Sequence, residues 1–251
     1  MQLPSAIIFN KFLALTYLPE SSDKKHRSST EKTTKSLSHK FQFWLLFLTA
    51  LIILQLPFIS IPFKWLESYF HEISHGLTAL LTGGSIIQIQ LFPNGAGLCT
   101  TRGGSAFFIS LMGYGGAILW GSLLFYLASS HRRIAQIFSM LLVGLLASSI
   151  LLWVRDLLTL FIVLVLLVLV LAQIKYSSQK YLQKFLQVTG LLVLINCLMS
   201  PLYLLDGQAR GDGAALANLT YIPEIIWVVI WFSAALLATY KLSKISLGSK
   251  R

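Results

Sequence analysis

Long uncharged hydrophobic runs follow one another along most of the chain, separated by short polar segments. Each run holds about 20 residues, the length of helix that crosses the hydrocarbon core of a bilayer. Because many of the connecting segments are short, consecutive helices must be antiparallel neighbours. The pattern predicts an all-α polytopic membrane protein with about six to seven transmembrane helices. The uncharged runs cover residues 41–63, 103–130, 134–154, 157–174 and 185–205, and a sixth candidate covers residues 222–240, with Glu224 near its start.

A more polar helix is predicted between the first two runs, over residues 65–82. It keeps an apolar face but also carries several ionisable side chains, which are costly inside a membrane and usually functional there. Gly83 and Gly84 follow it and are typical of a helix C-terminus. We therefore expect this helix to be only partly inserted, beside six full crossings. Its ionisable residues are Glu67, His71, Glu72 and His75.

The segment after this helix has the pattern of a β-hairpin. Residues 86–92 are partly alternating and rich in β-branched side chains, residues 93–97 have turn composition, and residues 98–101 can form the return strand. Such a hairpin could present a free edge to an extended peptide, or it could serve as structural cover.

Composition agrees with a membrane protein, because 55% of the 251 residues are hydrophobic, only 12% are charged, and the mean hydropathy is +0.72. Two cysteines exclude a disulfide framework. Residues 1–40 predict a largely disordered basic N-terminal tail, because they include a long polar stretch rich in Ser, Thr and Lys. Residues 41–240 form the membrane-embedded core, and residues 241–251 form a short basic C-terminal tail.

The net charge of +11 is concentrated in the two tails, and no basic stripe interleaved with aromatic residues suggests nucleic-acid binding. Cytoplasmic flanks of membrane proteins beside anionic lipid carry such charge. If the polar helix or the run before it does not cross fully, sixteen Lys and Arg residues lie inside and four outside. We therefore predict a multi-pass protein of the cell (inner) membrane with both termini cytoplasmic.

Within the polar helix, residues 71–75 form the motif HExxH. Residues four apart share a helix face, so His71 and His75 can bind one zinc ion. Glu72 is adjacent and can act as the general base that takes a proton from the attacking water. With five His and five Glu in the chain, chance would produce this pattern about 0.002 times.

A catalytic zinc ion takes three protein ligands, so a third ligand must come from outside the motif. Acidic residues are scarce in the membrane core. Glu67 is one helical turn before His71 and is better suited to support the metal ligands or to lie at an interface. Asp206 and Asp212 remain as the candidates, although each could instead be a turn former or a helix N-cap.

Several segments of the chain match one known family: residues 71–76, 80–84, 113–116, 205–207 and 211–214, with Asn196, Pro201, Pro223 and Trp227. Together they resemble the site-2 proteases, which are intramembrane zinc metallopeptidases, and especially their peptidase M50B-like branch. The resemblance covers about residues 41–240. It implies a metallopeptidase-like helical core, bound zinc and hydrolysis of peptide bonds at membrane depth. Asp206 matches the Leu-Asp-Gly signature of the wider family, whereas Asp212 matches the branch and is favoured.

The function predicted is that of a zinc-dependent intramembrane endopeptidase acting on membrane-protein substrates in the lipid bilayer. His71, His75 and either Asp212 or Asp206 would hold Zn²⁺, and Glu72 would be the base. A non-proteolytic metal-binding membrane scaffold or chaperone would keep the ligands without needing Glu72, and it stays open as the alternative. The substrate and the oligomeric state do not follow from the sequence.

Overall fold

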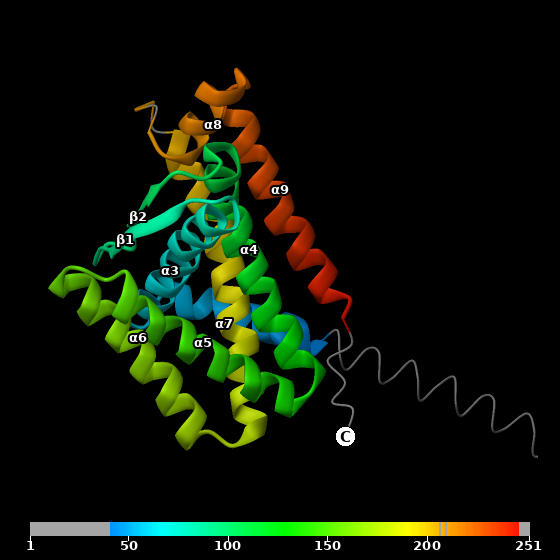
Figure 1. The fold of residues 1–251 in the computed structure, drawn as a ribbon. Coiled ribbons are helices and arrows are strands. Elements are labelled where there is room, and N and C mark those ends of the chain that lie inside the picture. Colours follow the sequence, from blue (N-terminus) through cyan, green and yellow to red (C-terminus); the bar gives the residue numbers. More distant parts are fainter. Residues whose placement is uncertain (1–40, 206, 209, 246–251) are drawn as a thin grey trace, which may run out of the picture. The chain divides into compact units, whose positions relative to one another are not determined.

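The computed structural model describes residues 41–205, 207–208 and 210–245 (Figure 1). This part of the chain is helical apart from one β-hairpin. A helix over Phe41–Leu54 comes first. The labelled elements that follow are α3 (Pro57–Leu81), β1 (Ser85–Leu91), β2 (Gly97–Arg102), α4 (Ala106–Ser130), α5 (Arg132–Leu152), α6 (Leu157–Tyr176), α7 (Gln179–Met199), the 3₁₀ helix η2 (Ser200–Leu205), α8 (Asp212–Thr220) and α9 (Glu224–Ser243).

Five stretches of the described chain are long and apolar enough to cross a membrane: α4, α5, α6, α9, and residues Tyr181–Leu205 of α7 and η2. A sixth crossing is possible if Phe41–Leu54 and α3 are counted together as one bent span. The protein is therefore an all-α polytopic membrane protein with a small β-hairpin after the HExxH helix, which confirms the predicted fold class.

The first hydrophobic run does not form the single helix expected over residues 41–63. The helix over Phe41–Leu54 stops, and α3 leaves it at an angle of 106°. The cause is Pro57, the first residue of α3, which has no N–H for the preceding helix and forces Leu56 into an extended conformation (φ −95°, ψ 102°). The HExxH helix therefore begins eight residues earlier than the pattern of polar residues indicated.

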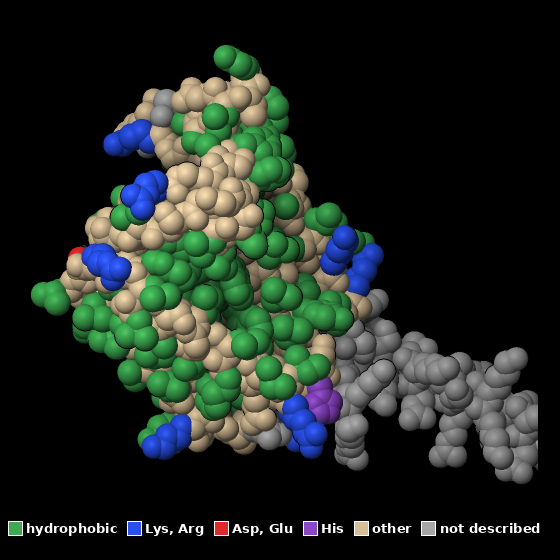
Figure 2. Space-filling model, viewed as in Figure 1, with side chains coloured by type: hydrophobic (Ala, Val, Ile, Leu, Met, Phe, Trp, Pro, Cys, Tyr) green, Lys and Arg blue, Asp and Glu red, His purple; other side chains and the backbone are tan. Residues whose placement is uncertain are grey.

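Many large apolar side chains lie on the surface of the helices. Phe58 and Leu157 are 87% and 84% exposed. Figure 2 shows hydrophobic side chains over much of the visible face, with Lys and Arg side chains mostly near its margins. A surface so apolar is stable against lipid hydrocarbon, where the helical backbone satisfies its own hydrogen bonds.

The hairpin strands pair antiparallel, with Ile89 opposite Cys99 and an irregularity between Ile86 and Gln88. The outer edge of β1 is bonded to the residue that follows α5 and to the first turn of α6, because Ile89 donates its N–H to the Trp153 carbonyl and Leu91 donates its N–H to Thr159 Oγ1. This edge is therefore structural. It is not open to an extended peptide at these two positions.

The centre of the helical core is α4, which packs against both α3 and α7. Its contact with α7 is very close, because a Cβ atom built on Gly190 would lie 2.7 Å from the carbonyl oxygen of Gly121. Small residues at such crossings let two helix backbones approach directly. Gly121 therefore serves the packing of α4 on α7.

The end of α7 is set by Pro201. The α-helix ends at Met199 and continues as the 3₁₀ helix η2, because proline cannot donate the N–H that the helix needs. Irregular backbone at membrane depth is tolerated where it is buried in protein or lines a cavity.

We expect both chain termini on the cytoplasmic side. With the bent pair counted as one crossing, the chain crosses six times, and the count of sixteen Lys and Arg inside against four outside applies. Figure 1 shows the α4–α5 turn, the α6–α7 turn and the end of α9 together at one end of the helices, opposite α8. Reporter fusions after Arg251 and within residues 20–40 measure on which side of the membrane each terminus lies. Signals from opposite sides of the membrane would contradict it.

Candidate metal centre

The HExxH motif lies in the second half of α3 and faces the protein interior. Glu72 and His75 are buried, and His71 is half-buried. The helix continues through the motif and ends after it, where Gly83 adopts φ +85° and the Gly84 N–H bonds back to the helix. This confirms the predicted helix end, since a left-handed residue is typical of a C-terminus.

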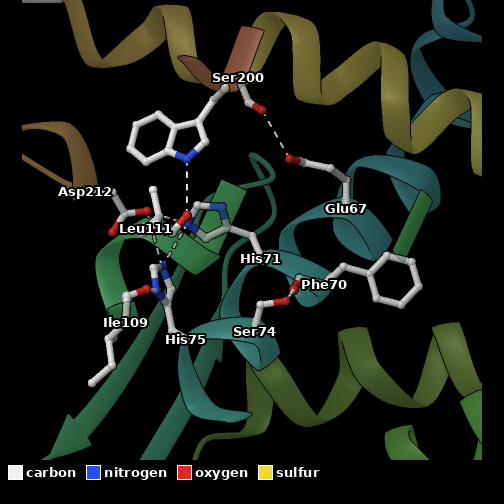
Figure 3. Close-up of polar contacts among 10 residues, drawn as sticks. Glu67, Phe70, His71, Ser74, His75, Ile109, Leu111, Ser200 and Asp212 are labelled. Carbon is white, nitrogen blue, oxygen red and sulfur yellow. Dashed lines mark hydrogen bonds and ion pairs between the residues drawn. The ribbon is translucent and has the colours of Figure 1, made fainter. Parts of the chain in front are cut away.

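His71 and His75 converge with Asp212 on one point (Figure 3). The Nε2 atoms of the two histidines are 3.0 Å apart. The Oδ2 atom of Asp212 is 3.1 Å from Nε2 of His71 and 3.3 Å from Nε2 of His75. Three potential ligand atoms from α3 and α8 therefore form a small triangle, although the helices are far apart in the sequence.

This triangle has the size and chemistry of a zinc site. Zinc bonds to nitrogen and oxygen at about 2.0–2.1 Å, so tetrahedral geometry separates neighbouring ligand atoms by about 3.3–3.4 Å. The observed separations of 3.0–3.3 Å lie close to that value. Two imidazoles and one carboxylate are a usual ligand set for catalytic zinc, with the fourth position left open.

A backbone carbonyl sets the orientation of His75. Its Nδ1 atom lies 2.7 Å from the carbonyl oxygen of Ile109, at the start of α4. A carbonyl can only accept a hydrogen bond, so Nδ1 carries the hydrogen and Nε2 is left with its lone pair directed at the triangle. Metal-binding histidines commonly use their second ring nitrogen in this way.

Asp212 is the first residue of α8, and the N-cap position is taken by Gly211 (φ +86°). The carboxylate of Asp212 therefore does not serve as the N-cap, which was its alternative role. Burial by itself raises the pKa of this carboxyl group, but the two imidazole rings beside it, His71 and His75, outweigh burial and hold the pKa below its ordinary value. Asp212 is consequently ionised and available as an anionic ligand.

The other predicted site residues fall into two groups. Glu72 lines the same cavity as the triangle and is 5% exposed, whereas Asp206 lies outside the described residues. Among the described residues, the His, Cys, Asp and Glu cluster that could hold a metal ion is His71, His75 and Asp212. The choice between Asp212 and Asp206 as ligand stays a prediction.

Two glycines let other elements lie directly against the motif. A Cβ atom on Gly113 of α4 would collide with the His75 ring and lie 2.7 Å from Oδ2 of Asp212. A Cβ atom on Gly97 of β2 would lie 2.6 Å from Oε1 of Glu72. The position of Gly113 therefore leaves room for the site. Gly97 was expected only as a turn residue.

The triangle and Glu72 open onto a cavity of about 770 Å³. Its walls come from α3, the hairpin, the start of α4, the end of α7 with η2, and the segment before α8. The hairpin side is β2 with the turn before it, so the strand nearest to Glu72 is also the strand that lines the cavity. Polar lining residues include Ser68, Asn94, Asn196, Ser200 and Tyr203.

Aromatic side chains support the triangle from the side of α9. The Tyr114 ring packs edge-on against His71 with centroids 4.4 Å apart, and Trp231 packs on Tyr114 at 4.8 Å. Trp231 also donates its indole N–H to the Leu111 carbonyl at 3.1 Å. Nothing local in the sequence indicates a role for these aromatic residues at the metal, because the packing of α9 on α4 beside the HExxH helix joins distant segments.

Comparisons with known proteins agree with this geometry. The description of one protein family, Peptidase M50B-like, matches residues 44–242, which include the motif, the hairpin and α8. No curated protein and no solved structure matches the chain. The family match covers well over half of the sequence and contains every residue of the candidate centre, and the chain therefore belongs to the Peptidase M50B-like family.

Proposed function

We propose that this protein is a zinc-dependent intramembrane endopeptidase that hydrolyses peptide bonds of membrane-protein substrates. The observation that supports it best is the convergence of His71, His75 and Asp212 in a cavity that Glu72 also lines. Family membership supports peptidase activity and a membrane location. The zinc ion, the base and the substrate class are our inferences from the donor set and the cavity.

In this proposal Nε2 of His71, Nε2 of His75 and Oδ2 of Asp212 hold the metal. When bound, zinc supplies Lewis-acid activation of water and of the substrate carbonyl group. The chain itself contributes the preset orientation of the ligands. His75 is fixed through its bond to Ile109, and His71 is held against the Tyr114 ring.

Glu72 moves the proton. Its carboxylate takes a proton from the attacking water and then delivers that proton to the nitrogen atom of the leaving amine. Glu72 therefore ends the reaction in the protonation state in which it began. The carboxylate lies under Gly97 of β2, where no side chain comes between it and the strand. Its position beside the histidines follows from the helix, because consecutive residues point about 100° apart.

The substrate must be extended at the cleavage site. A peptide bond inside a helix is enclosed by its own hydrogen bonds and side chains, so a membrane helix has to unwind before a water molecule can attack it. The cavity is lined by β2, and an unwound segment can lie along that strand by backbone pairing. The proposed substrate is therefore a membrane-spanning segment that unwinds easily near the end of its helix.

Removal of the metal tests this proposal. Purified protein should contain about one zinc ion per chain and cleave a member of a panel of fluorescently labelled single-span membrane proteins in phospholipid vesicles. Dialysis against a chelator should abolish cleavage, and addition of zinc should restore it, because the ligands persist in the folded chain. A protein that binds zinc but cleaves none of the panel would favour the scaffold or chaperone function instead.

A further inference from the structure

Glu67 is a buried carboxylate in the same cavity, and the mechanism above gives it no role. It is 7% exposed and lies one helical turn before His71 on α3. Its Oε1 atom accepts a hydrogen bond from the hydroxyl of Ser200 at 3.1 Å (Figure 3). A buried carboxylate is costly unless its oxygens are partnered, and Ser200 engages only one of the two.

The two histidines of the motif differ in how they are held. His75 donates its Nδ1 hydrogen to the Ile109 carbonyl. His71 makes its contacts to His75 and Asp212 through Nε2, and its Nδ1 has no hydrogen bond to any described residue. A histidine that binds zinc almost always donates its second ring N–H to a carboxylate, a carbonyl or water. His71 therefore lacks the partner that His75 has.

We propose that Glu67 is the positioning residue of His71, with its Oε2 atom accepting the Nδ1 hydrogen of that ring. Residues four apart on a helix lie on the same face, with Cβ atoms about 5–6 Å apart. Figure 3 shows the Glu67 and His71 side chains on the side of α3 that faces Ser200. The inference rests on the proposed zinc site, because the bond matters only if Nε2 of His71 binds metal.

The Ser200 contact gives this arrangement its rigidity. Pro201 ends the α-helix of α7, and Ser200 is the first residue of the 3₁₀ helix that follows. Its hydroxyl lies 3.1 Å from Oε1 of Glu67 on α3 and 3.0 Å from the Asn196 carbonyl of its own helix, so its single hydrogen is shared between the two acceptors. A carboxylate accepts hydrogen bonds at both oxygens, so the second oxygen stays available for His71. The break in α7 would then help to orient a zinc ligand.

The first experiment measures zinc affinity in the purified full-length chain by competition with a chromophoric chelator. Glu67→Gln should weaken zinc binding by about 10–100-fold, the usual effect of losing a residue that orients a metal ligand. Glu67→Met, which has similar length and no oxygen, should weaken it at least as much. Asp156→Asn is the matched control, because Asp156 caps α6 through the Thr159 N–H, a role that asparagine fulfils equally. It should bind zinc as wild type does.

A second measurement separates positioning from general stability. In zinc-loaded protein labelled with ¹⁵N-histidine, the ring N–H groups of His71 and His75 should give two downfield proton resonances. Glu67→Gln should move one of them and leave the other in place, since the Ile109 partner of His75 is unchanged. A packing defect would not select one ring, and circular dichroism and the melting temperature check that each variant is folded.

Some outcomes overturn the inference and leave the proposed function intact. Unchanged zinc affinity in Glu67→Gln and Glu67→Met, or two unmoved ring resonances, would remove Glu67 from this role. An affinity loss in Asp206→Asn with none in the Glu67 variants would assign the orienting role to Asp206. If wild-type protein binds no zinc, or if His71→Ala retains its zinc at full affinity, the proposed function itself fails.

Discussion

Glu72→Gln should lower the rate of peptide-bond hydrolysis by about 10²–10⁴-fold, the usual contribution of a general base. Glutamine keeps the shape of the side chain beneath Gly97 but cannot take a proton from water. Zinc content should stay near one ion per chain, because the proposed ligands are His71, His75 and Asp212. The measurement combines turnover of a labelled single-span membrane protein in vesicles with metal analysis of the same sample.

The matched control is Asp156→Asn. Asp156 caps α6 through the Thr159 N–H and does not line the cavity, so this change of carboxylate to amide should leave turnover near the wild-type rate. Cleavage by Glu72→Gln at the wild-type rate would contradict the protease proposal. Loss of zinc together with activity in Glu72→Gln would instead show that Glu72 supports the metal.

Asp212→Asn should lose most of the bound zinc and all activity that depends on it. The neutral amide that replaces the carboxylate is a poor zinc ligand, and the negative charge that faces both Nε2 atoms at 3.1 Å and 3.3 Å disappears. His71→Ala and His75→Ala should have the same effect, because each removes one of three ligands. Zinc content after dialysis against buffer is the measurement.

Asp206→Asn is the decisive comparison for the third ligand. If Asp212 is the ligand, this variant should keep its zinc or lose at most the 10–100-fold in affinity expected of a supporting residue. Zinc lost only from Asp206→Asn would reverse the assignment. Zinc kept by both variants would exclude both aspartates from the metal centre.

Local features of the sequence were sufficient to predict the elements. A hydrophobic run long enough to span a bilayer predicts its helix because the backbone must satisfy its own hydrogen bonds in lipid. Turn residues between two β-branched segments predicted the hairpin. The relation of His71 to His75 follows from helix periodicity alone. In each case the deciding interactions join residues a few positions apart.

The bend before Pro57 was missed although its cause is local. The uncharged run over residues 41–63 continues through the proline without interruption, and hydrophobicity carries no information about backbone N–H groups. The consequence is large, because α3 turns away by 106° from the helix before it. The length of the uncharged run therefore predicted a longer straight helix than the chain forms there.

Only the tertiary structure decided which distant residues meet. By itself the sequence determined the fold class, the two histidines and the neighbouring glutamate, because these depend on composition and on helix geometry. It left two aspartates open, and it gave no sign that Tyr114 would lie against His71 or Ser200 against Glu67. These contacts depend on close helix crossings, such as α4 on α7 at Gly121 and Gly190. The packing of whole helices sets such crossings, and no short segment of the chain specifies that packing.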